Sequence, residues 1–473
     1  MRTFALRCMA LAVLGAVAAC STVGPDYRIP EHAAVRLQAA QGPLAGLEAH
    51  AAQASPLPPR WWRLYDDPAL DGLIAQAFAA NTDLRVASAN LQRAAAALDE
   101  ADSARRPGAS VSAAPAYGRA SAAARGLPDA MPDTGSYDAG ASVSYQVDLF
   151  GKIARAIEAA NADAQAAQAA YDLARVTVAA DTVRSYAQVC SAGRQLEVAR
   201  ASIALQEQFL ALTRKRTDMG RGTSLDVSRA QGQLEQLRAA LPPLEAQRAT
   251  ALYRLAVLTG QVPGSLPASL ADCHTPLALH EPVPAGDGAA LLRRRPDIRQ
   301  AERALAAATA RIGVATADLY PSITLGLSAG STGALSRFGA ANAFRWSLGP
   351  LISWSLPNTG LARSRIAQAE ASGAAALARF DAAVLNALQE TSSALAVYAR
   401  DLDRSAALRA ARDRNREAAE QARKLYSVGR TDFLTALDAD RTLANAESAL
   451  AAAQGQLASD QVALFLALGG GWE

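Results

Sequence analysis

The sequence predicts an α+β membrane protein in which very long helices accompany a small number of β-strands. Three observations support this fold class. Most of the chain consists of two copies of an internal sequence repeat. Each copy contains stretches in which apolar and polar residues alternate with the period of 2 that is typical of strands. Each copy also contains long stretches, almost free of Gly and Pro, that are expected to be helical. We therefore expect two structural repeats, each contributing two strands and a long helical hairpin.

The N-terminus has the pattern of a bacterial lipoprotein signal peptide. An apolar run from Cys8 to Ala19 is shorter than the roughly 20 residues that a membrane-spanning helix needs. Small residues (Val17-Ala18-Ala19) stand before Cys20, as they do where a diacylglycerol is attached to a cysteine thiol. We expect residues 1–19 to be removed and Cys20 to carry this covalent lipid. An ordinary signal peptide with an incidental cysteine is the alternative. Ser21, in place of Asp, favours delivery to the outer membrane.

The repeat is visible as matching residues at nearly constant offsets. Thr82-Asp83-Leu84-Arg85 recurs 214 residues later as Pro296-Asp297-Ile298-Arg299, and beyond Pro107 the offset becomes 209, as between Gly220 and Gly429. We therefore divide the chain into the signal peptide (1–19), a lipidated N-terminal segment (20–80), a first repeat (81–260), a linker (261–294) and a second repeat with a C-terminal tail (295–473).

Each repeat is expected to begin with a helix and to continue with two strands. The helices Leu84 to Ala104 and Ile298 to Leu319 are rich in Ala, Leu and Arg, and a proline follows each of them. The expected strands are Ser110 to Tyr117, Ser136 to Val147, Ser322 to Ala329 and Phe344 to Leu356, with a shift of register at Pro350.

The strands alternate between apolar and polar residues, with aromatic residues toward their ends. This pattern matches outer-membrane barrel strands, whose apolar side chains face lipid. A half-buried sheet in a water-soluble domain is the alternative. The aromatic residues expected to face the membrane are Tyr137, Tyr145, Phe344, Trp346 and Trp354.

The remainder of each repeat is expected to form a helical hairpin. Lys152 to Thr217 and Leu361 to Val428 would each extend on the order of 100 Å as helices. After a glycine turn, the returning helices run from Leu225 to Thr259 and from Phe433 to Leu468. Such helices are too long for one globular core and suit coiled-coil packing.

Four strands cannot close a barrel, and an open sheet edge in lipid leaves backbone groups unsatisfied at a cost of several kcal/mol each. The protein is therefore expected to assemble with copies of itself. Three chains would close twelve strands, and the arithmetic also allows a dimer.

The charge, cysteine and histidine content of the chain argues against several classes of function. The net charge is +3 without a basic block, which argues against nucleic-acid binding. Cys190 and Cys273 remain after signal removal, and they are expected either to form a disulfide or to be two buried thiols. The four histidines lie in expected loops without metal-ligand spacing, and no catalytic constellation is visible. We therefore expect neither an enzyme nor a metal site, and no cofactor other than the lipid.

Several motifs resemble those of the TolC-like outer-membrane efflux proteins, in the lipoprotein branch typified by OprM and NodT. They are Val23-Gly24-Pro25-Asp26-Tyr27, Trp61-Trp62 with Asp67-Pro68, Arg295 to Glu302 running on to Tyr320-Pro321, and Tyr145 to Gly151 with unusual residues at Gln146 and Val147. The resemblance covers essentially the whole mature chain. It implies a homotrimer with a twelve-stranded β-barrel, an α-helical barrel of twelve helices, and a collar to which residues 20–80 and 261–294 contribute.

The resemblance also implies a function. The protein would be the outer-membrane channel of a tripartite efflux system, a passive exit duct for drugs or other small toxic compounds. A periplasmic adaptor and an inner-membrane pump of the resistance-nodulation-division (RND) class would be its partners. A lipid-anchored periplasmic coiled-coil scaffold or adaptor, and a type I protein-secretion duct, are the alternatives.

By the same resemblance, residues near the second glycine turn would close the duct at its periplasmic gate. Leu434, Asp438 and Arg441 fall on one helix face. Leu434 would be an apolar plug and Asp438 part of a negative ring, with bridges from Asp438 to Arg229 or from Asp226 to Arg441. A solvated helix face is the alternative. The turn residues expected to face an adaptor are Gly220, Arg221, Thr223, Gly429, Arg430 and Thr431, for which ordinary turn chemistry is the alternative.

Overall fold

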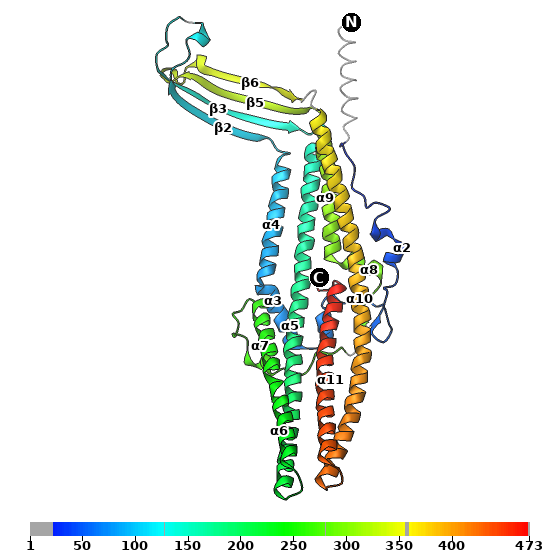
Figure 1. Cartoon of the computed structure of the whole chain (residues 1–473). Helices are drawn as coiled ribbons and strands as arrows, with labels where there is room; N and C mark the ends of the chain where they lie inside the picture. Colours follow the sequence, from blue (N-terminus) through cyan, green and yellow to red (C-terminus); the bar gives the residue numbers. More distant parts are fainter. Residues whose placement is uncertain (1–21, 127, 280, 355–358, 472–473) are drawn as a thin grey trace. The chain divides into compact units, whose positions relative to one another are not determined.

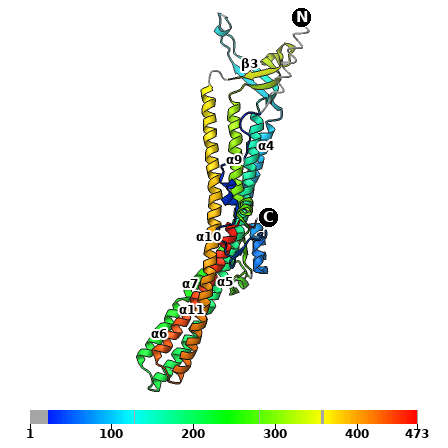
Figure 2. The ribbon, with the colours of Figure 1, turned by 90° about the vertical axis from the view of Figure 1, so that its right-hand side faces the viewer.

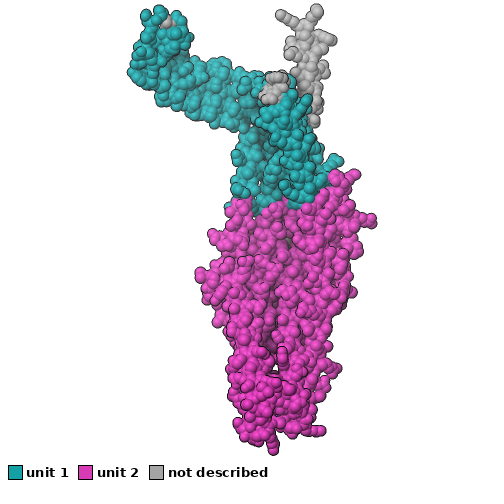
Figure 3. All heavy atoms as spheres, viewed as in Figure 1, with its two compact units in different colours: residues 1–30, 91–167, 301–380 teal, residues 31–90, 168–300, 381–473 magenta. Residues whose placement is uncertain are grey.

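The computed structural model describes residues 22–126, 128–279, 281–354 and 359–471. The predicted signal peptide and Cys20 therefore lie outside the described residues, as does Leu356. The chain divides into two compact units (Figure 3), of which unit 1 comprises residues 1–30, 91–167 and 301–380, and unit 2 comprises residues 31–90, 168–300 and 381–473. Each unit takes segments from both predicted repeats.

Unit 1 contains a four-stranded antiparallel sheet (Figure 1). Its strands are β2 (Gly108–Gly118), β3 (Thr134–Val147), β5 (Ser322–Ala334) and β6 (Phe344–Ser353), in the order β2-β3-β5-β6. Each predicted repeat supplies one hairpin, and the β3–β5 pair joins the two hairpins.

The register gives this sheet two different faces. Ser110, Ser142, Ser328 and Ser347 pair in one row across all four strands, and hydroxyl–hydroxyl hydrogen bonds of 2.8 Å join Ser110 to Ser142 and Ser328 to Ser347. The adjacent row, which points to the other face, consists of Val111, Ala141, Ala329 and Trp346. The alternation expected from the sequence is therefore present in all four strands.

The predicted register shift at Pro350 is wrong. Leu325 pairs with Pro350 and Ile323 with Ile352, so the pairing continues through the proline without a break. Proline removes one N–H group from β6 and does not change the partners of the residues on either side of it.

The long helices have the expected positions. The repeat-related pairs are α4 (Thr82–Ser103) with α9 (Pro296–Ala317), and α5 (Lys152–Asp218) with α10 (Thr359–Ser427). The returning segments are α6 (Ser224–Ala239) with α7 (Leu241–Leu258) in the first repeat, and α11 (Phe433–Ala467) in the second. In unit 2, α6 and α11 contact each other (Figure 2).

The expected unbroken helix from Leu225 to Thr259 is wrong. It is interrupted at Ala240, which ends α6 and begins α7. Pro242 and Pro243 follow in the first turn of α7, and proline cannot donate a hydrogen bond to the preceding turn of a helix. The second repeat has no proline here, so α11 runs without a break.

An aromatic core holds unit 2 together. Trp61 is fully buried, stacks on Phe465 with ring centroids 4.4 Å apart, and donates from Nε1 to the carbonyl oxygen of Gly470 at 3.3 Å. Trp62 and Tyr65 pack edge-on against Trp61. The predicted N-terminal segment is thus fixed to the end of the second repeat. Its helices are α2 (Gln38–Gln41) and α3 (Pro68–Ala80).

The predicted linker packs against α5. Its strand β4 (Val283–Pro284) pairs in parallel with β1 (Ala52–Gln53), and α8 (Gly288–Arg294) follows. A disulfide joins Cys190 of α5 to Cys273 of the linker. The linker comes so close beside it that a Cβ at Gly193 would collide with the carbonyl oxygen of Cys273.

The disulfide closes a long loop, with a sequence separation of 83 residues. Because a cross-link restricts the unfolded chain, the double variant Cys190→Ser/Cys273→Ser should lower the free energy of unfolding by about 2–4 kcal/mol. Denaturant titration of the detergent-solubilised protein measures this. Reductant should destabilise the wild type and leave the variant unchanged; equal midpoints for both proteins in oxidising buffer would contradict the expectation.

Candidate functional site

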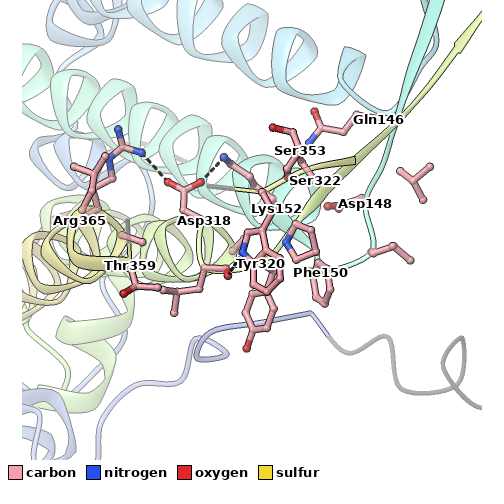
Figure 4. Close-up of a pocket in the computed structure, with 18 residues that line it drawn as sticks. Gln146, Asp148, Phe150, Lys152, Asp318, Tyr320, Ser322, Ser353, Thr359 and Arg365 are labelled. Atoms are coloured by element: carbon pink, nitrogen blue, oxygen red, sulfur yellow. Dashed lines mark hydrogen bonds and ion pairs between the residues drawn. The ribbon is translucent and has the colours of Figure 1, made fainter. Parts of the chain in front are cut away.

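A pocket of about 220 Å³ lies in unit 1, where the strands meet the helices (Figure 4). Asp318 is placed between two cations, with Lys152 Nζ at 2.6 Å and Arg365 Nη1 at 3.0 Å. Burial alone would raise the pKa of the Asp318 carboxyl, but the hydrogen bonds and charges of Lys152 and Arg365 outweigh burial and lower it. The three charges satisfy one another, so this cluster braces the junction and offers no free acid or base.

Further contacts fix the same junction. Asp148 caps α5 by accepting hydrogen bonds from the backbone N–H groups of Ile153 and Ala154. Phe150 stacks on Tyr320 with ring centroids 4.6 Å apart (Figure 4). The Tyr145–Gly151 and Tyr320-Pro321 motifs therefore meet, and their role here is to connect strand to helix.

The segment that follows Cys20 is clasped to α5 and α9. The Arg155 guanidinium donates to the carbonyl oxygens of Val23 and Gly24 and forms a 2.7 Å ion pair with Asp26. Gly24 has a φ of +87°, and a Cβ there would collide with the backbone of Gly313. The motif Val23 to Tyr27 is thus a structural clasp. Arg155 was not singled out by its sequence pattern, because Val23, Gly24 and Asp26 are more than a hundred residues away.

Most of the aromatic residues expected to face the membrane are exposed in the single chain. Tyr145, Phe344, Trp346 and Trp354 all present large exposed fractions. Tyr137 differs, because it is only 7% exposed, donates or accepts a hydrogen bond at Ser331 Oγ and packs edge-on against Phe338. Phe338 itself is exposed and was not in the expected set.

The two glycine turns close the helical hairpins of unit 2. Gly220 and Gly429 have φ angles of +73° and +77°, which favour glycine. Thr223 caps α6 in a reciprocal capping box with Asp226, and the Asp432 side chain caps α11. Arg221 and Arg430 are exposed. Among the turn residues, Thr223 therefore has a structural task of its own, whereas the arginines are available to a partner.

The expected gate residues lie on one exposed helix face. Leu434, Asp438 and Arg441 are all exposed on α11. Among the described residues of this one chain, no ion pair joins Asp438 to Arg229 or Asp226 to Arg441. Asp226 is occupied by its cap, and the partly buried neighbour Asp440 pairs with Arg423 at 2.7 Å. The exposed face is thus free to meet other surfaces.

A different contact joins the two hairpins near their turns. Phe209, Tyr426 and Phe433 form a buried aromatic cluster. The Arg216 guanidinium lies 4.4 Å from the centroid of the Tyr426 ring and donates to the Tyr426 carbonyl oxygen. Sequence pattern could not reveal this contact, because Arg216 comes from α5 and Tyr426 from α10.

The described residues contain no group of three or more His, Cys, Asp or Glu side chains placed to hold a metal ion. None of the described helices is both long and apolar enough to cross a membrane.

A sheet with one apolar and one polar face, combined with paired helical hairpins, is typical of a channel-forming outer-membrane protein. Comparison with known proteins identifies the family: the chain matches the outer membrane efflux protein family over residues 73–261 and 289–470, and it belongs to that family. Each of the two matched stretches largely coincides with one predicted repeat.

Individual relatives are similar along nearly their whole length. The toluene efflux pump outer membrane protein TtgC of Pseudomonas putida is 31% identical, with 96% of this chain and 93% of that protein covered. The probable outer membrane lipoprotein SilC of Salmonella typhimurium is 28% identical, with 99% of each covered. The solved outer-membrane channel OprN is 37% identical, with a TM-score of 0.87 and with 96% of this chain and 100% of that chain covered.

These findings confirm the predicted family, the α+β fold class and the location in the outer membrane. The chain is an outer-membrane efflux duct protein and not an enzyme.

The Arg216–Tyr426 contact should hold the hairpin turns together. Arg216→Ala removes a cation–π contact and a charged hydrogen bond, worth together about 1–2 kcal/mol, so amides around Phe209 and Phe433 should exchange with deuterium roughly tenfold faster. Hydrogen–deuterium exchange with mass spectrometry measures this. Lys215→Ala, an exposed neighbour, is the control. Equal exchange rates in both variants would show that Arg216 does not hold the turns.

Proposed function

We propose that three copies of this chain form one duct, in which twelve strands close a β-barrel in the outer membrane. The observation that carries this proposal is the sheet itself. Among its described strands, β2 and β6 are the two edge strands. Its apolar face is exposed at Val111, Leu327, Trp346 and Leu348. In lipid, unpaired edges and an open sheet are unfavourable, whereas an apolar face is favourable. Pairing of β6 with β2 of the next copy removes the edges.

The polar face then lines the passage. The serine row through Ser142 and Ser328 presents small neutral hydroxyls, and its neighbours on that face include Gly140, Gly326 and Gly330. Small side chains leave room. Asp138 and Arg345, which also lie on this face, form an ion pair at 2.7 Å, so the face has little net charge and imposes little selectivity. These features support a passive exit duct, with the choice of compound made by a pump.

The cargo class that we propose is small toxic compounds, including drugs, expelled by an inner-membrane pump through a periplasmic adaptor. One relative is named for the efflux of toluene, a small apolar toxic molecule. The exposed Arg221 and Arg430 at the glycine turns suit contact with an adaptor, and an RND-type pump is the partner that we expect. Gly220, Thr223, Gly429 and Thr431 shape the same turns.

We also propose that Cys20 carries a covalent lipid. The contacts of Arg155 with the segment after Cys20 support this proposal. Because Arg155 holds Val23 and Gly24, only Ser21 and Thr22 separate Cys20 from a fixed backbone. A lipid at Cys20 would thus be anchored close to the strand–helix junction. A relative is also named as a probable outer membrane lipoprotein.

We further propose that Leu434, Asp438 and Arg441 form the periplasmic gate, with Asp226 and Arg229 on the facing hairpin. The support is their shared exposed face next to the hairpin turns. In a trimer, three Asp438 carboxylates would approach one another, and a ring of carboxylates favours cations. Arg229 would then form its ion pair with Asp438 of another copy, and Arg441 with Asp226 of another copy. Neither pair would form within one chain.

The barrel proposal predicts opposite responses at two neighbouring residues of β6. Leu348 lies on the apolar face and Ser347 on the polar face. Leu348→Arg would place a charge in lipid at a cost of about 2–4 kcal/mol, whereas Ser347→Arg would extend into the passage. We expect the first variant to reduce the amount of trimer in outer-membrane fractions and the second to be inserted normally. Equal insertion of the two variants would contradict the assignment of the faces.

The gate proposal predicts that Asp438→Ala opens the closed duct. Loss of the carboxylate removes its bridges, so uptake of bulky antibiotics should rise and their inhibitory concentrations should fall several-fold. Asp413→Ala, which removes an exposed carboxylate on α10, is the matched control. If Asp438→Ala leaves uptake unchanged while trimer levels are normal, the residue is not part of the gate.

A further inference from the structure

Two carboxyl groups meet between α10 and α11 in unit 2. Asp460 of α11 is only 8% exposed. Its Oδ1 accepts a 2.8 Å hydrogen bond from Gln456 Nε2, but its Oδ2 is buried and has no hydrogen-bond donor among the described residues. α10 packs against α11 at this level, because Gln461 Nε2, one residue beyond Asp460, donates a 3.2 Å hydrogen bond to the Tyr398 hydroxyl of α10, and the Asp401 carboxyl of α10 interacts with the Asp460 carboxyl. Two carboxylates cannot donate to each other, so this contact is complete only when one of them carries a proton.

No cation in the described part of the chain forms an ion pair with Asp460. From α10, Arg404 approaches Asp401 at 3.8 Å and is largely exposed, and the Tyr398 hydroxyl accepts a hydrogen bond from Gln461. Gly455 of α11, five residues before Asp460, lies against the neutral side chains of Ser191 and Gln195 of α5.

The remaining charges nearby pair with one another at the surface. Arg400 pairs with Glu48 and with Asp403, and His50 lies 3.5 Å from Asp403. None of these groups supplies the donor that Asp460 Oδ2 lacks.

The first repeat shows that the fold does not require these carboxyl groups. At the offset of 209 residues, Asp401 corresponds to Ala192 and Asp460 to Ala251. Both alanines are buried, at 0% and 4% exposed. The two acids of the second repeat therefore occupy positions at which the first repeat buries two methyl groups. Burial of acids in place of methyl groups is unfavourable unless their charge is removed.

Protonation of the Asp460 carboxyl removes its negative charge, and it occurs in a pH range that experiments can reach. Burial, and then the hydrogen bond with Asp401, raises the pKa of Asp460 to about 6. A carboxyl whose pKa is higher in the folded state binds its proton more tightly there than in the unfolded chain. Its favourable contribution is fully present below about pH 4 and is lost as the pH rises through about 6.

We propose that Asp401 and Asp460 form a proton-binding site, in which one shared proton holds α11 against α10. When the proton leaves, two buried carboxylates repel each other and this helix contact loosens. The site makes the second hairpin sensitive to pH, whereas the first hairpin, with its two alanines, is insensitive. The proposal concerns the folded chain and does not depend on the identity of the transported compounds.

The shared proton can be detected directly on the full chain in detergent. Infrared difference spectra between about pH 5 and pH 7.5 should show loss of a protonated carboxyl C=O band in the wild type, since these values bracket the pKa of about 6. The band should be absent from Asp460→Asn and from Asp401→Asn. Asp403→Asn, an exposed acid on the same helix, is the control and should keep the band.

The helix contact is tested by hydrogen–deuterium exchange. Protection factors of α11 amides near Asp460 should fall at least about tenfold between the two pH values, because a shift of about two pKa units corresponds to as much as a hundredfold. In Asp460→Asn the amide can donate to Asp401 permanently, so protection should stay high at both pH values. The double variant Asp401→Ala/Asp460→Ala reproduces the first repeat and should also be insensitive to pH.

Three results would overturn the proposal. The first is a carboxyl band that persists in both single Asn variants. The second is wild-type protection of α11 that is independent of pH. The third is protection that depends on sodium or potassium concentration without any carboxyl band, which would assign the site to a metal cation. Circular dichroism and native gels confirm that each variant is folded, and the double-alanine variant repeats the test if a single variant does not fold.

Discussion

The backbone hydrogen bonds between β3 and β5 are the contact on which the sheet depends. They join two hairpins that come from distant parts of the sequence, with Ser136 paired to Ala334 at one end and Val147 to Ile323 at the other. Because side chains alternate along strands, this register also decides which residues share a face. A slip by one residue would bring the serine row into line with Trp346 and Leu348. The ion-paired junction at Asp318 and the stack of Phe150 on Tyr320 fix the places where these strands leave the helices.

Much of this architecture could be predicted from the sequence, because local pattern and internal repetition were both strong. Alternation located the strands, the absence of proline located the long helices, and the glycine turns lay where expected. Two predictions failed for local reasons. Pro350 leaves the pairing of β6 with β5 unbroken, and Pro242-Pro243 divide a helix that continues in the other repeat.

Other parts could not be predicted, because they depend on contacts between distant segments. Arg155, Arg216 and Asp460 gain their roles from partners on other elements, and nothing in their immediate sequence distinguishes them from surface residues. The gate residues illustrate the reverse case. Helical spacing placed Leu434, Asp438 and Arg441 on one face, but a single chain does not contain the surface that this face would meet.

The β3–β5 contact has a consequence for symmetry. An assembly of separate half-length chains would have to keep every hairpin identical, since one sequence would serve all positions. When both halves are in one chain, each hairpin can have its own sequence. The two hairpins of this chain differ clearly: Ala192 and Ala251 of the first correspond to Asp401 and Asp460 of the second. The returning helix of the first is broken at Ala240, whereas the corresponding α11 is continuous. A ring of three such chains, as proposed above, would keep the closed geometry of six similar hairpins while presenting two chemically distinct kinds in alternation.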